Sequence, residues 1–159
     1  EVVAGLRLAY ERWWATLQPV FDQYVRIELG GAENPVELMA HDWHSNNQGV
    51  PWHQSHVRHA RASNGPWAVE VVQAGRYEVT LRRWPAMLQR AMGCVHASLA
   101  VGKVHVAIDL LPSMTKASFV VDLPAGPAML LTTLRQTSDQ PAGGVAHGAY
   151  FVSVRAIDY

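Results

Sequence analysis

The stretch Trp67-Ala-Val-Glu-Val-Val-Gln-Ala-Gly-Arg-Tyr-Glu-Val-Thr-Leu81 decides the fold class. Apolar residues occupy every second position over 67–71 and again over 77–81, the pattern of half-buried β-strands. Ala74-Gly75 between the two runs is a turn signal, so the sequence predicts a β-hairpin here. The alternation also predicts that Trp67 and Tyr77 point into the core.

Short strands are predicted along most of the remaining chain. The alternating segments are 24–29, 36–40, 95–101, 104–110, 118–123, 128–134 and 149–155, and residues 56–58 are a candidate for one more. Residues 86–94 fit a short helix or a loop. No βαβ alternation occurs. The sequence therefore predicts an all-β fold, an antiparallel, jelly-roll-like β-sandwich of about eight or nine strands.

The first residues have a different period. Over 1–18, apolar residues recur at spacings of three and four, which predicts an amphipathic helix, and Pro19 prevents its continuation. We therefore expect two parts: an N-terminal helix over 1–18, and a β-sandwich domain over 19–159.

Composition excludes several classes of protein. The 159 residues are 49% apolar and 16% charged, which excludes a disordered tail. Lys and Arg number 13, as do Asp and Glu, so the chain lacks the basic excess of a nucleic-acid-binding module. No run approaches 18 apolar residues, so no membrane span is expected. The lone Cys94 excludes an internal disulfide and a multi-cysteine zinc site.

Five of the eight histidines fall between His41 and His59. With Asp42 they offer nitrogen and oxygen ligands of the kind that zinc accepts. The spacing lacks a helical zinc motif, however, and loop histidines packed beside Trp43 and Trp52 explain the cluster as well. No metal site is assigned.

Tryptophans are concentrated between Trp43 and Trp84. One interpretation is a stacking platform for a sugar ring, with Asp42, His44 or Arg83 binding hydroxyl or sulfate groups. The alternative is that these aromatic residues belong to the core. The candidate ligand-binding residues are Asp42, Trp43, His44, Trp52 and His53.

No constellation of catalytic residues stands out. The sequence has no Gly-x-Ser-x-Gly elbow and no phosphate-binding glycine loop. Cys94 is followed by Val and His, and a buried, unreactive thiol explains it. Glu70 and Glu78 would face each other across the predicted hairpin as a carboxylate pair, or simply be two charges on an exposed sheet face. We expect no catalytic residue.

The opening Glu1-Val-Val-Ala-Gly-Leu-Arg-Leu-Ala-Tyr-Glu-Arg-Trp-Trp14 resembles the terminal helix of the catalytic part of bacterial arylsulfatase-like sulfatases. The rest is similar to the C-terminal extension that follows this helix in a subset of them. The matching stretches are 27–30, 41–43, 50–54, 65–71, 74–85, 123–126 and 148–155.

The resemblance implies a parent enzyme that hydrolyses the sulfate esters of sulfated carbohydrates, in the periplasm or outside the cell. Sulfatases use formylglycine, made in a Cys/Ser-x-Pro-x-Arg motif, and calcium. The chain lacks that motif, so no cofactor is expected in this fragment. Its implied role is a non-catalytic domain that packs on the catalytic domain, stabilises it and shapes substrate access.

Two other functions remain open at this point. The Trp-rich region and the Ala-Gly-x-Tyr hairpin at 74–77 favour a carbohydrate-binding module, with a sulfated or neutral glycan as partner. A free-standing enzyme is the third possibility, and the absence of acid–base or nucleophile motifs disfavours it.

Overall fold

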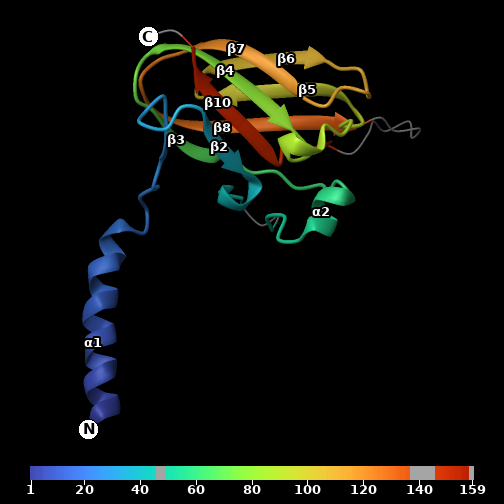
Figure 1. Cartoon of the computed structure of the whole chain (residues 1–159). Helices are drawn as coiled ribbons and strands as arrows, with labels where there is room; N and C mark the ends of the chain where they lie inside the picture. Colours follow the sequence, from blue (N-terminus) through green and yellow to red (C-terminus); the bar gives the residue numbers. More distant parts are fainter. Residues whose placement is uncertain (46–48, 137–145, 158–159) are drawn as a thin grey trace.

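The computed structural model describes residues 1–45, 49–136 and 146–157. Two β-sheets face each other, and a single helix leads away from them at the N-terminal end (Figure 1). This arrangement confirms the predicted β-sandwich with one N-terminal helix.

The larger sheet has six strands. Their order is β1 (Ile27–Leu29), β3 (Trp67–Val71), β8 (Gly126–Gln136), β5 (Cys94–Val101) and β6 (Val104–Asp109), and β9 (Ala146–His147) pairs with β8. All pairings are antiparallel except β1 with β3, which is parallel.

The smaller sheet has four antiparallel strands. Their order is β2 (Val36–Met39), β10 (Phe151–Ala156), β4 (Gly75–Arg82) and β7 (Ala117–Leu123). In β7 and β10 buried residues occupy alternate positions, so one face of this sheet covers the core and the other faces solvent.

The predicted hairpin is wrong, although both of its strands exist. β3 pairs with β1 and β8, whereas β4 pairs with β10 and β7 in the other sheet. The turn at 72–74 therefore crosses from one sheet to the other, and the inward faces of β3 and β4 oppose each other across the core. Glu70 and Glu78 consequently do not form a pair. Glu78 accepts a hydrogen bond from Arg155 Nη2 at 2.7 Å.

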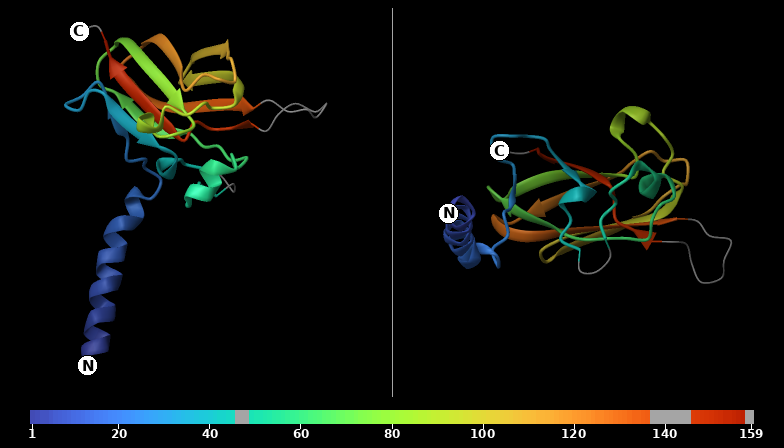
Figure 2. Two further views of the ribbon diagram at one scale, coloured as in Figure 1. Left: turned by 45° about the vertical axis from the view of Figure 1, so that its right-hand side comes forward. Right: turned by 90° about the horizontal axis from the view of Figure 1, so that it is seen from below.

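The helical segments are one long helix and four short ones. They are α1 (Val2–Leu17), η1 (Gln18–Val20), η2 (Ala40–Asp42), α2 (Gln54–Arg58) and η3 (Ala86–Leu88). α1 confirms the predicted helix, buries none of its residues and points away from the sandwich (Figure 2). Within the described residues no helix is long and apolar enough to cross a membrane. The strand considered for 56–58 is wrong, because these residues belong to α2.

The core lies between the sheets and is anchored by large aromatic residues. Trp67 and Tyr77 are both almost fully buried, as predicted. Trp67 Nε1 donates to the carbonyl oxygen of Met39 at 2.7 Å and so links the two sheets. Tyr77 Oη lies 2.6 Å from the position that a Cβ on Gly30 would take, and Gly30 has φ +71°, so glycine is required there.

Candidate functional site

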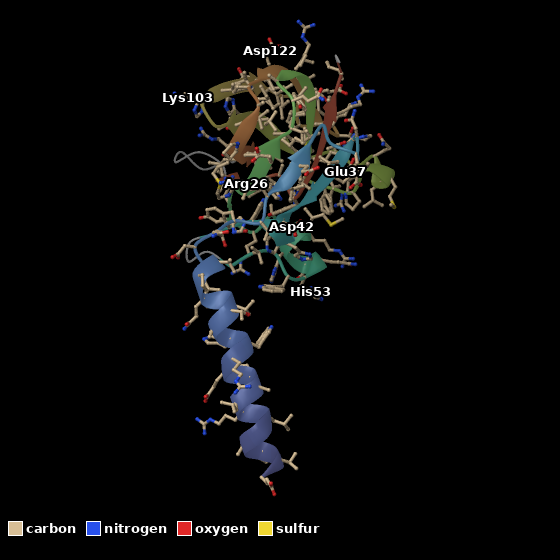
Figure 3. The ribbon with its side chains drawn as sticks, turned by 90° about the vertical axis from the view of Figure 1, so that its left-hand side faces the viewer. Arg26, Glu37, Asp42, His53, Lys103 and Asp122 are labelled. Atoms are coloured by element: carbon tan, nitrogen blue, oxygen red, sulfur yellow. The ribbon has the colours of Figure 1, made fainter. Side chains whose placement is uncertain are left out.

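The segment between β2 and β3 forms a cap at one end of the sandwich. The chain leaves β2 at Met39, passes through η2 and α2, and returns at Trp67. Glu37, Asp42 and His53 follow one another along this side of the molecule (Figure 3). The cap contains all five predicted ligand-binding residues, and the structure separates them into two groups.

Trp43 belongs to the core. It is 5% exposed, and its ring contacts the rings of Trp67 and Tyr150 at centroid distances of 5.6 and 6.0 Å. A Cβ on Gly148 would lie 2.5 Å from Trp43 Cζ2, and one on Gly65 would lie 2.8 Å from Trp43 Cβ. Gly148 therefore makes room for the indole and Gly65 for its Cβ, and the buried ring offers no face to a ligand.

Trp52 has the opposite environment. It is 76% exposed and borders a hollow of about 170 Å³. Residues from the end of β2, the cap and the start of β10 line this hollow: Met39, Ala40, His41, Pro51, Trp52, His53, Gln54, Val57, Tyr150 and Phe151. The His41 ring lies 6.2 Å from the Trp52 ring, centroid to centroid. We call this surface the Trp52 hollow.

The backbone that carries Trp52 is held by histidine side chains. The Trp52 backbone N–H donates to His56 Nδ1 at 3.1 Å, and the Ser55 N–H donates to His53 Nδ1 at 3.1 Å, which caps α2. His59 Nδ1 lies 2.8 Å from the Ser55 carbonyl oxygen. These bonds fix the turn and so pre-position the exposed indole.

The histidine cluster stabilises the cap by hydrogen bonds to its backbone. Three of its members bond to the cap backbone, as described above. Within the ranges that the structure describes, no group of three or more His, Cys, Asp or Glu residues converges as a metal site. The geometry therefore offers no ligand set for the zinc interpretation.

Asp42 and His44 lie outside the Trp52 hollow. The His44 ring packs edge-on against Tyr24 at 4.6 Å, and its backbone N–H donates to Pro66. Asp42 is exposed at the end of η2. Of the five candidates, only Trp52 and His53 therefore line the hollow.

Sequence reasoning missed the floor of the hollow. Phe151 is the register partner of Met39 in the small sheet, and Tyr150 precedes it. Alternation marks Phe151 as a strand residue, but pairing between residues this far apart in the chain has no local sequence signal. Tyr150 Oη donates to the Arg61 carbonyl oxygen, and burial raises the pKa of Tyr150 to about 12.

Arg83, considered above as a sulfate ligand, is used internally. Its guanidinium donates to the carbonyl oxygens of Val57, Arg58 and Met92 at 2.8–3.2 Å. It thus ties α2 to the end of β4. Burial lowers the pKa of Arg83 from its ordinary value.

Cys94 is 1% exposed. Burial raises the pKa of its thiol to about 11, although nearby Arg83 acts in the opposite direction. A thiol with this pKa is almost wholly protonated at neutral pH, so Cys94 is a core residue and not a nucleophile.

His147 is a buried imidazole at the same end of the sandwich. Its ring stacks on Tyr150 at 4.9 Å, and its Nδ1 lies 2.7 Å from the Gly148 carbonyl oxygen. Nε2 has no hydrogen-bond partner among the described residues. Burial lowers the pKa of His147, so the imidazole is neutral at pH 7.

Comparison with known proteins gives a result for the fold alone. No family model and no curated protein matches the chain. Among solved structures, a ruminal GH26 endo-β-1,4-mannanase aligns at 14% identity and a TM-score of 0.51, over 80% of this chain. This chain spans only 27% of the mannanase chain.

Two carbohydrate-binding modules align less closely. The C-terminal CBM6 of LamC, a marine laminarinase from Zobellia galactanivorans, has a TM-score of 0.43 and 11% identity. The alignment covers 77% of this chain and 99% of that module. The module CBM6cm-2 from Cellvibrio mixtus lichenase 5A, solved with cellotriose, gives the same TM-score and identity. The alignment covers 79% of this chain and 100% of that module.

These findings overturn the sulfatase interpretation. The aligned structure with a TM-score above 0.5 is a mannanase and not a sulfatase, and no family model supports a sulfatase. Identification as a sulfatase C-terminal domain was wrong, because one fold serves proteins of many functions and short stretches within it do not identify a family. The likeness to part of the mannanase supports the β-sandwich fold and shows nothing beyond the fold.

Proposed function

We propose that the chain is a non-catalytic carbohydrate-binding module and that the Trp52 hollow is its binding site. The observation that carries the proposal is the exposure of Trp52, 76%, on a turn fixed by hydrogen bonds. An indole this exposed contributes little to the packing of the core.

The chemistry of the hollow suits a sugar. The flat indole offers an apolar surface to the C–H face of a pyranose ring, and Met39, Pro51 and Phe151 extend that surface. His41 and His53 border the same hollow and supply ring nitrogens for hydroxyl groups. Because the turn is already ordered, little conformational entropy is lost when a ligand binds.

The test is binding of soluble polysaccharides to the full chain, measured by affinity electrophoresis and isothermal titration calorimetry. β-1,4-Mannan is the first neutral glycan to test, since the aligned enzyme is a mannanase. Trp52→Ala should weaken binding by about tenfold or more, the loss expected for a central aromatic contact. Trp13→Ala is the matched control, because Trp13 is 54% exposed on α1.

The proposal fails if no polysaccharide, neutral or acidic, retards the chain. It also fails if Trp52→Ala and the wild-type chain bind with equal affinity.

A further inference from the structure

Charge is distributed unevenly over the sandwich. Chain segments 39–45, 49–66, 82–94 and 109–117 lie at the end that carries the cap, next to the C-terminal part of β8. They contain six basic residues and two acidic ones, although the whole chain has 13 of each. The basic residues are Arg58, Arg61, Arg82, Arg83, Arg90 and Lys116, and the acidic ones are Asp42 and Asp109.

Three of these cations form what we call the cationic edge: Arg82, Arg90 and Lys116. Arg82 ends β4, and Lys116 immediately precedes β7, the neighbouring edge strand. Arg82 lines a hollow of about 280 Å³ together with Lys116 and Arg155. Arg82 also lies near Arg90, whose guanidinium carbon is 4.1 Å from the Trp84 ring centroid.

The cationic edge has no carboxylate partner within the part of the chain that the structure describes. Some other cations have a carboxylate partner, and Arg76 lies 3.7 Å from Asp122. Arg155 lies 2.7 Å from Glu78, and Arg7 lies 3.2 Å from Glu11. Gathering unpaired like charges is unfavourable, and a negatively charged ligand would relieve it.

The cationic edge is continuous with the Trp52 hollow. Phe151 lines that hollow and is the register partner of Met39 on one side and of Arg82 on the other. Neighbouring strands are about 4.8 Å apart, so Met39 and Arg82 are separated by roughly 10 Å across the sheet. Hydroxyl groups of Thr80 and Ser153 lie on the same face next to Arg82.

We propose that the ligand is an acidic polysaccharide, with one unit stacked on Trp52 and a carboxylate or sulfate group of a neighbouring unit bound by Arg82 and Lys116. This inference rests on the proposed function and names its ligand class. Guanidinium and ammonium groups donate short, charge-assisted hydrogen bonds to both kinds of anion. Three acidic residues lie on this face. Glu37 is opposite Ser153, Glu78 lines the same hollow as Arg82 and is paired with Arg155, and Asp122 is paired with Arg76.

The experiment compares four polymers on the full chain by affinity electrophoresis and calorimetry: polygalacturonate, dextran sulfate, neutral β-1,4-mannan and single-stranded DNA. The test variant is Arg82→Gln/Lys116→Gln. The control is Arg12→Gln/Lys103→Gln, which makes the same change in net charge on α1 and at the opposite end of the sandwich (Figure 3).

We expect one of the acidic polysaccharides to bind about tenfold more tightly than mannan, with affinity that falls as salt is raised. The uronate and sulfate arms identify which anion is recognised. The test variant should remove this advantage and the control should retain it.

Three results would overturn the inference: mannan binding as tightly as the acidic polymers, equal losses in both double variants, or DNA binding as tightly as either polysaccharide. If mannan alone binds and Trp52→Ala abolishes this, the proposed function stands and the acidic ligand does not. If acidic polymers bind equally well to Trp52→Ala, the proposed site itself is wrong.

Discussion

Truncation of the two cap tryptophans, Trp43 and Trp52, should lower the stability of the fold by very different amounts. Trp43 is 5% exposed, so folding removes roughly 200 Å² of it from water, worth about 5 kcal/mol at 25 cal/mol/Å². Trp52 is 76% exposed, so folding removes only roughly 50 Å², worth about 1 kcal/mol. Trp43→Ala should therefore cost about 3–5 kcal/mol of stability, and Trp52→Ala about 1 kcal/mol or less.

Urea unfolding followed by far-UV circular dichroism measures the difference without using tryptophan emission. With a slope of about 2 kcal/mol/M, Trp43→Ala should lower the midpoint by roughly 2 M. Since that variant can fail to fold, Trp43→Phe provides a second measurement. It keeps an aromatic ring on the side of Gly148 and should lose less stability than the alanine variant.

The reasoning fails if Trp43→Ala and Trp52→Ala shift the midpoint equally. It fails as well if Trp52→Ala costs more than about 2 kcal/mol, because Trp52 would then be a packing residue.

Two further predictions concern the buried titratable groups. Burial lowers the pKa of His147, so as pH falls the imidazole is protonated in the unfolded chain before it is protonated in the folded one. The free energy of unfolding should therefore be highest above about pH 6.5 and should decline below it. Urea midpoints between pH 7.5 and 5 should show this decline, and a His147→Phe variant with an equally steep decline would refute the assignment. The pKa of Cys94, about 11, and its burial predict slow reaction with a thiol reagent at pH 8 and fast reaction in urea. Rapid labelling of the native chain would contradict this.

Strand existence could be predicted from the sequence, and strand partners could not. Alternation over 67–71 and 77–81 correctly indicates two amphipathic strands. The same pattern results whether their apolar faces lie side by side in one sheet or oppose each other across a core. Pairing of β4 with β10 depends on residues distant in sequence, and the Ala74-Gly75 turn carries no information about it.

The site shows a similar division. Trp43 and Trp52 both occur in loop sequence, and nothing local distinguishes them. Gly148 leaves room for the Trp43 ring, and this contact is made only in the folded state. At α2, His53 acts as the helix cap, a role more usual for Ser, Thr, Asp or Asn, so the sequence carries no ordinary helix-start signal there.

The position of β10 has a consequence for synthesis of the chain. This strand lies between β2 and β4, and its register joins Val36 to Val154. A ribosome must therefore release nearly the whole domain before the small sheet can assemble. Until then β2 and the inner edge of β4 have unpaired backbone groups. A messenger RNA truncated before the codon for residue 151 would yield a chain with two open strand edges. Such a chain is prone to aggregation and is a substrate for chaperones.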